Sequence, residues 1–137
     1  MKISHVSKAI LVIAGLIIVF VGAGTLFTPE ILQASSGITR MSAPSLLNEI
    51  RASGGALLVC GMLIVAGAFV AQLTFSALLM STMLYLSYGA SRLYSIIIDG
   101  MPDETLIQAF AIEIVVGLAS LFVFIGYLKK RTKGLIL

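Results

Sequence analysis

The stretch AILVIAGLIIVFVGAGTLF, residues 9–27, contains no charged side chain and is long enough to cross a bilayer as a helix. Three further apolar stretches follow it and make up much of the remaining chain. Hydrophobic residues are 59% of the 137 residues, charged residues are 11%, and the mean hydropathy is +1.11. A soluble chain of this length could not bury so much apolar surface. The sequence therefore predicts an all-α polytopic membrane protein with a single domain over residues 1–137.

Turn signals divide this domain into four predicted transmembrane helices. The helices are expected at about residues 8–27, 45–71, 75–98 and 103–128. Pro29 ends the first of them, and the sequence DGMP at 99–102 marks the last connection. Within the first connection, Ile31 and Leu32 are expected to form a short interfacial turn. The break at Gln72 and Thr74 is brief, and the alternative is one continuous helix over residues 45–98.

Basic residues lie mainly near the two ends of the chain, which indicates the orientation in the membrane. Lys2 and Lys8 precede the first predicted helix, whereas Arg40 is the only basic residue in the connections on the other side. The last helix is followed by Lys129, Lys130, Arg131 and Lys133. The positive-inside rule then predicts an antiparallel four-helix bundle with both termini in the cytoplasm. A cleaved signal peptide is the alternative for the first helix, but its apolar run is longer than a usual signal core.

Composition also excludes several classes of partner. The net charge of +3 does not indicate a nucleic-acid partner, because most basic residues flank apolar segments. Cys60 is the only cysteine and His5 the only histidine, so neither a thiolate cage nor a histidine cluster can form within one chain. We expect no metal and no cofactor.

Five ionisable residues are predicted to lie in the outer part of the bilayer or at its edge, where charges are costly and usually pair. They are Glu49, Arg51, Arg92, Asp99 and Glu113. Counting along straight helices places Arg92 and Glu113 at nearly the same depth on antiparallel neighbours, which predicts an ion pair. Arg51 is expected to pair with Asp99 or Glu113.

A polar stripe on the third predicted helix includes one member of this pair. Its members share one face at spacings of three and four residues: Tyr85, Tyr88, Arg92, Ser95 and Asp99. Asn48 and Glu49 face the same region from the first turn of the second helix. The stripe is explained either by a hydrogen-bond network that fixes helix packing, which we prefer, or by the lining of an outward-facing pocket.

Glycines recur at seven-residue spacing on the first two predicted helices, at Gly15 and Gly22 and at Gly54 and Gly61. Small residues let membrane helices approach closely. Packing within the bundle is the preferred role, and a homodimer surface is the alternative.

The segments NEIRASGG (48–55), Arg92, DGMP (99–102) and Glu113 together resemble a bacterial family of small four-helix inner-membrane proteins catalogued only as a domain of unknown function. Ser53 stands where that family often has an aromatic residue before the paired glycines. A more distant similarity is to DoxX-like four-helix membrane proteins. The resemblance implies a four-helix fold and the bacterial inner membrane, but it implies no activity.

Three functions are compatible with these features. The preferred one is a non-enzymatic membrane protein whose charged cluster binds a lipid, a small molecule or a larger membrane complex near the periplasmic side. The second is a dimeric proton- or ion-coupled transporter that uses Glu113. The third is a membrane enzyme acting on a lipid or quinone through Glu49, Glu113 and the tyrosines.

Overall fold

The computed structural model describes residues 4–38 and 43–135, and every regular element in these two ranges is an α-helix. The elements are α1 (His5–Phe27), α2 (Pro29–Ala34), α3 (Pro44–Gly67), α4 (Thr74–Asp99) and α5 (Glu104–Leu135). The predicted all-α class is confirmed for these ranges. Lys2 and Arg40, which entered the orientation argument, lie outside the described residues.

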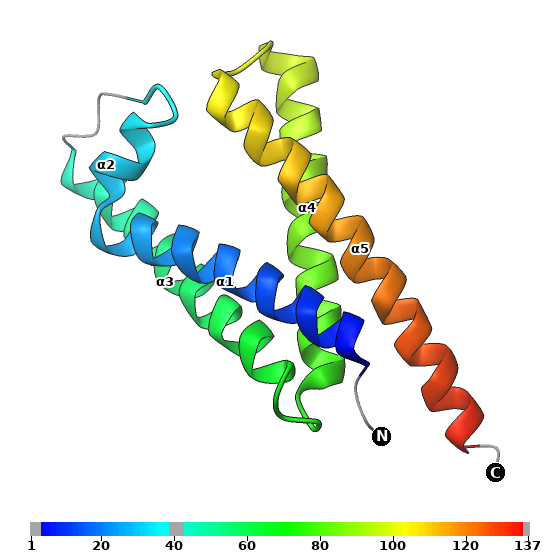
Figure 1. Ribbon diagram of the computed structural model, residues 1–137. Coiled ribbons are helices and arrows are strands. Elements are labelled where there is room, and N and C mark those ends of the chain that lie inside the picture. Colours follow the sequence, from blue (N-terminus) through cyan, green and yellow to red (C-terminus); the bar gives the residue numbers. More distant parts are fainter. Residues whose placement is uncertain (1–3, 39–42, 136–137) are drawn as a thin grey trace.

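The four long helices form two antiparallel pairs, α1 with α3 and α4 with α5 (Figure 1). The pairs lie close together at the end that holds the N-terminus, and they diverge toward α2 and the α4–α5 connection. Buried apolar side chains from both pairs, among them Leu11, Ala14, Ile64, Leu78 and Tyr85, form one core. The Tyr85 hydroxyl donates a hydrogen bond of 2.7 Å to the Ala14 carbonyl oxygen, which joins the two pairs inside this core.

Glycines allow the backbones of α1 and α3 to approach closely. A Cβ on Gly15 would lie 2.8 Å from a backbone nitrogen of α3, and one on Gly61 would lie 2.7 Å from Val19 N of α1. Gly22 and Gly54 face the partner backbone in the same way. Because backbone atoms cannot move aside as a flexible side chain does, these positions require glycine. The predicted role of these glycines in helix packing is thus found between α1 and α3 of one chain.

A connection separates α3 from α4, so the alternative prediction of one continuous helix over residues 45–98 is wrong. The chain leaves the helix after Gly67 and resumes it at Thr74, so α3 also ends before the predicted residue 71. The buried Thr74 hydroxyl donates to the Gly67 carbonyl oxygen at 2.9 Å. This bond satisfies a carbonyl that the helix end leaves without an intrahelical partner.

One other boundary differs from the prediction, whereas the short turn expected at Ile31 and Leu32 is found as part of a six-residue helix. α5 continues to Leu135 instead of ending at 128, because lysine and arginine are good helix formers and suit the negative end of the helix dipole. The first connection contains the separate helix α2, which begins with Pro29 at its first position and Glu30 in its first turn.

Candidate functional site

An ion pair joins α4 and α5. The Arg92 Nε donates hydrogen bonds to both carboxylate oxygens of Glu113, at 2.9 Å to Oε1 and 2.7 Å to Oε2. The side chain of Glu113 is 14% exposed and that of Arg92 is 30% exposed. The predicted pairing of these two residues is therefore found in the structure.

Gly89 of α4, one turn before Arg92, brings the two helices close at this level. A Cβ there would lie 2.6 Å from Ile114 Cδ1 of α5, so a larger residue would require the end of the Ile114 side chain to move. Further along the same interface, the buried hydroxyls of Ser81 and Ser120 lie 2.8 Å apart and share a hydrogen bond. Small and hydroxyl-bearing residues thus fix the register of α4 against α5, and that register sets the ion pair.

A cavity of about 170 Å³ lies beside the ion pair, between the two helix pairs. All four long helices contribute to its wall, which is mainly apolar: Ile17, Ile18, Val21, Leu57, Tyr85, Tyr88, Arg92, Ala109, Ile112 and Glu113. The two charged residues are its strongest polar groups. The cavity therefore combines a mainly apolar wall with one ion pair, Arg92 and Glu113.

Arg92 has donors that the ion pair does not use. A guanidinium group has five N–H donors, and only the Nε–H is bonded to Glu113. Among the described residues, neither Nη nitrogen of Arg92 makes a hydrogen bond, and neither does the Tyr88 hydroxyl. By contrast, the Tyr85 hydroxyl donates its only proton to Ala14. Within the lining, Arg92 and Tyr88 are thus the side chains with donors left for a guest molecule.

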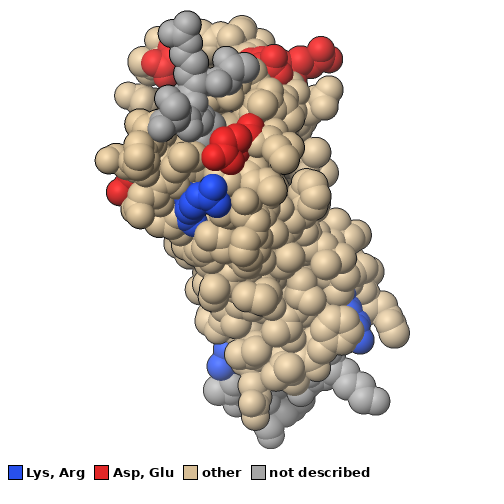
Figure 2. All heavy atoms as spheres, turned by 90° about the vertical axis from the view of Figure 1, so that its left-hand side faces the viewer, with Lys and Arg blue, Asp and Glu red and all other residues tan. Residues whose placement is uncertain are grey.

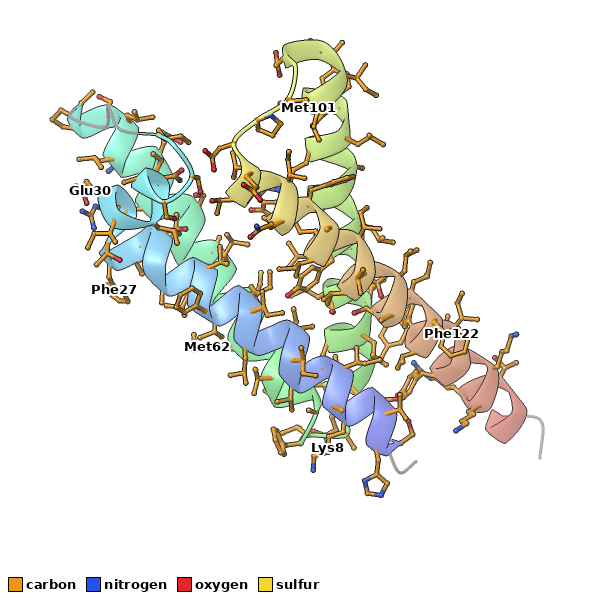
Figure 3. All side chains as sticks on the ribbon, turned by 45° about the horizontal axis from the view of Figure 1, so that its top comes forward. Lys8, Phe27, Glu30, Met62, Met101 and Phe122 are labelled. Carbon is orange, nitrogen blue, oxygen red and sulfur yellow. The ribbon has the colours of Figure 1, made fainter. Side chains whose placement is uncertain are left out.

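Arg51 does not pair with Asp99 or Glu113, and that prediction is wrong. Its Nη2 lies 3.8 Å from Glu30 Oε1, and its Nη1 donates to the Leu26 carbonyl oxygen at 2.6 Å. Both partners come from the end of α1 and from α2, which pack beside the start of α3. Figure 3 places Glu30 next to Phe27, at the opposite end of the α1–α3 pair from Lys8. Arg51 thus anchors the α1–α2 corner.

The remaining predicted site residues do not join the ion pair. Ser95 donates to Asp99 Oδ2 at 2.9 Å, one turn apart on α4, and both residues are exposed. Asn48 and Glu49 are exposed on α3 and make no ion pair or side-chain hydrogen bond with another described residue. The expected convergence of three spans is therefore wrong. The two helix pairs diverge toward this end, which leaves the Arg92–Glu113 pair to α4 and α5 alone.

Several contributors to the site were not predicted. The α1 face formed by Ile17, Ile18 and Val21 closes one wall of the cavity, but an apolar face on an apolar helix carries no distinguishing signal. Glu30 could have been found, because a proline followed by an acidic residue is typical of a helix start. Among the described residues, no group of three His, Cys, Asp or Glu side chains could hold a metal ion.

Three of the helices are long and apolar enough to cross a membrane: α1, α3 and residues Glu104–Thr132 of α5. The fold is thus of the class of small all-helical proteins whose helices are suited to a bilayer. The chain belongs to the family described as Domain of unknown function (DUF4345), whose model matches residues 6–124. No curated protein and no solved structure matches the chain. The more distant similarity to DoxX-like proteins stays a prediction.

Proposed function

We propose that α4 is the fourth transmembrane helix, so that α1, α3, α4 and α5 all cross the bilayer. The 26 residues of α4 span about 39 Å, which exceeds the roughly 30 Å of a hydrocarbon core. Its polar residues lower its hydropathy, but Ser81, Thr82 and Tyr85 are buried against other helices. Its exposed face carries apolar side chains such as Met83 and Leu93. This distribution suits a helix that faces lipid on one side and protein on the other.

The distribution of charge supports a placement with both termini in the cytoplasm of a bacterium. Lys8, Lys129 and Lys130 lie at one end of the helices, whereas Glu30 and Asp103 lie at the other. Figure 2 shows a broad uncharged surface between the charged side chains at the α2 end and the basic ones at the opposite end. Positive residues favour the cytoplasmic side, so the α2 end would face the periplasm.

Within this protein, the cavity beside Arg92 would bind a small amphiphilic molecule whose head group accepts hydrogen bonds, such as a carboxylate or a carbonyl. The single observation that carries this proposal is that both Nη nitrogens of Arg92 make no hydrogen bond with the described residues, although Arg92 lines a mainly apolar cavity. Unpaired donors are costly inside a membrane, so an acceptor there is stabilising. A volume of about 170 Å³ is below the roughly 300–1,000 Å³ of ordinary ligand pockets, which favours a small molecule over a whole lipid.

Binding fits this site better than catalysis does. The Glu113 carboxylate accepts two hydrogen bonds from Arg92, and the Tyr85 hydroxyl donates its proton to the Ala14 carbonyl oxygen, so both groups already have structural partners within the protein. The dimeric transporter and the lipid or quinone enzyme stay predictions without a supporting contact in the described residues.

The test is to purify the protein from bacterial membranes in a mild detergent and to identify co-purified small molecules by mass spectrometry. Ala109→Leu places a larger side chain in the cavity, whereas Ala111→Leu adds the same atoms to an exposed position on the same helix. We expect a bound amphiphile in the wild type and in Ala111→Leu, and its loss in Ala109→Leu. The proposal is wrong if the wild type carries no such molecule, or if Ala109→Leu retains it at the wild-type level.

Arg92→Lys separates the head-group contact from the shape of the cavity. Lysine keeps the positive charge and can still pair with Glu113, but it lacks the forked donors of arginine. The amphiphile should be retained less well in this variant while the protein stays folded. Unchanged retention would show that Arg92 does not contact the head group.

A further inference from the structure

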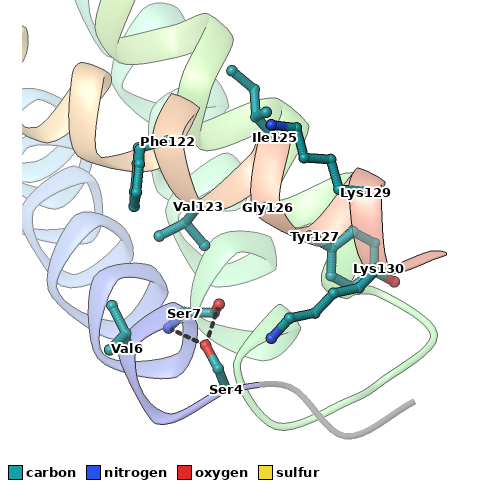
Figure 4. A pocket seen from close by; sticks show the side chains of 10 residues that line it. All are labelled: Ser4, Val6, Ser7, Phe122, Val123, Ile125, Gly126, Tyr127, Lys129 and Lys130. Carbon is teal, nitrogen blue, oxygen red and sulfur yellow. Dashed lines mark hydrogen bonds between the residues drawn. The ribbon is translucent and has the colours of Figure 1, made fainter. Parts of the chain in front are cut away.

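A second opening lies at the opposite end of the molecule, between the start of α1 and the end of α5. Its volume is about 380 Å³. Along α5 the wall changes from apolar at Phe122 to charged at Lys130, whereas on α1 the apolar Val6 lies between Ser4 and Ser7 in the first turn (Figure 4). The change along α5 suits a phospholipid, which has acyl chains below a polar head group.

Two lysines line this groove, and Figure 4 separates them: Lys129 points along α5 toward Ile125, whereas Lys130 points toward the start of α1. The Lys8 Nζ lies 4.5 Å from the centre of the Phe69 ring, and the Arg131 guanidinium lies 5.2 Å from the centre of the Phe75 ring. Figure 4 shows Lys130 reaching from α5 across the groove toward α1. Among the described residues, it forms no salt bridge. Its charge is therefore directed into the groove.

Ser4 and Ser7 form the opposite side of the polar end. Their hydroxyl oxygens lie 2.7 Å apart, and the Ser7 backbone N–H donates to Ser4 Oγ at 3.1 Å. Because each hydroxyl has one proton and two lone pairs, this arrangement still leaves a hydroxyl able to bond a phosphate oxygen. Lys130 and the two serines thus face each other across a space suited to an anionic group.

The apolar part of the groove is open to the surroundings. Phe122 is 80% exposed, so in the proposed membrane placement it would lie against acyl chains. Gly126 lies between Phe122 and Lys130 on α5, and a Cβ there would meet no other atom within 4 Å. The missing side chain at Gly126 leaves space along α5.

We propose that this groove binds an anionic phospholipid of the cytoplasmic leaflet, with the phosphate between Lys130 and the Ser4–Ser7 pair and an acyl chain along Phe122. Basic pockets between helices on the cytoplasmic side suit anionic head groups. The inference depends on the membrane placement proposed above, but it does not depend on the cavity beside Arg92. The two sites lie at opposite ends of the helices, so each can fail alone.

Native mass spectrometry of the full chain tests this inference. The delipidated protein is titrated with phosphatidylglycerol and, separately, with phosphatidylcholine of the same acyl chains. We expect saturable binding of one phosphatidylglycerol with a clear preference over phosphatidylcholine. Equal binding of the two lipids would overturn the proposal.

Two pairs of variants locate the binding. Lys130→Gln should weaken phosphatidylglycerol binding about fivefold, since one basic residue near an anionic head group is worth about that factor. Arg131→Gln removes the same charge beside the groove and should leave the affinity unchanged. Gly126→Leu fills the groove and should abolish saturable binding, whereas Gly55→Leu adds the same bulk at another open position on α3 and should have no effect.

The controls decide between a site and general attraction to anionic lipid. Equal weakening by Lys130→Gln and Arg131→Gln would show diffuse electrostatics and would overturn the proposal. So would wild-type binding by a folded Gly126→Leu protein. If Gly126→Leu does not fold, the comparison of Lys130→Gln with Arg131→Gln decides the question alone, because both side chains are exposed.

Discussion

Breaking the Arg92–Glu113 pair should destabilise the protein by different amounts, depending on which partner is removed. Arg92→Met keeps the apolar stem but leaves the carboxylate of Glu113, only 14% exposed, without its partner. Losing the partner of a well-buried charge costs about 3–5 kcal/mol, so we expect about 3 kcal/mol here. Glu113→Gln leaves a guanidinium that is 30% exposed and still has a neutral acceptor beside it, so we expect only about 1–2 kcal/mol.

The double variant tests whether these costs come from the pair itself. Arg92→Met with Glu113→Gln leaves no uncompensated charge, so its cost should be smaller than the sum of the two single costs. The difference is a coupling energy, which we expect to be about 1–3 kcal/mol for groups in direct contact. The charge-swapped protein, Arg92→Glu with Glu113→Arg, should recover part of the stability lost in either single variant.

The free energy of unfolding can be measured by titrating the protein in mixed micelles with a denaturing detergent. Because the chain contains no tryptophan, the helix signal in far-ultraviolet circular dichroism is the suitable observable. Unchanged stability in both single variants, or costs that add within about 0.5 kcal/mol, would refute the pair as a structural element.

Three further predictions concern packing and topology. Gly61→Ala brings a Cβ to 2.7 Å from Val19 N and should lower the free energy of unfolding by about 1–3 kcal/mol. At Gly55, an added Cβ meets no atom within 4 Å, so Gly55→Ala should raise the free energy of unfolding by about 0.5–1 kcal/mol. Equal effects would contradict the close α1–α3 approach. Ser81→Ala leaves the buried hydroxyl of Ser120 without its partner and should cost about 1–2 kcal/mol of unfolding free energy. Replacing both serines with alanine should cost less than twice that amount. If the shifts in melting temperature add instead, they would argue against the Ser81–Ser120 hydrogen bond. A C-terminal fluorescent-protein fusion should fluoresce and a C-terminal alkaline-phosphatase fusion should be inactive, and the reverse result would place this terminus outside the cytoplasm.

Much of the fold follows from features that one sequence displays. Apolar length predicts the long helices, and seven-residue glycine spacing predicts the face on which α1 and α3 meet. The Arg92–Glu113 contact follows from depth along two helices joined by a short connection, because antiparallel neighbours place such residues at one level. Apolar length, residue spacing and depth along a helix are enough for these inferences.

The partner of Arg51 could not be obtained in the same way. Depth along a helix gives the level of a side chain, but it does not give the direction in which that side chain points or the tilt between helix pairs. Arg51 and Asp99 have similar predicted depth, yet the two pairs diverge at that end and α2 brings Glu30 to Arg51 instead. The cavity depends on the same tilt, so its α1 wall was also beyond prediction.

An experimental structure in lipid nanodiscs tests the central claim most directly, since it shows whether the cavity between the helix pairs exists in a bilayer and what it contains. We expect the Nε of Arg92 on the carboxylate of Glu113 and density for a small amphiphile whose head group contacts the remaining Arg92 donors. A cavity filled by protein side chains, or Arg92 and Glu113 apart and facing lipid, would contradict the account.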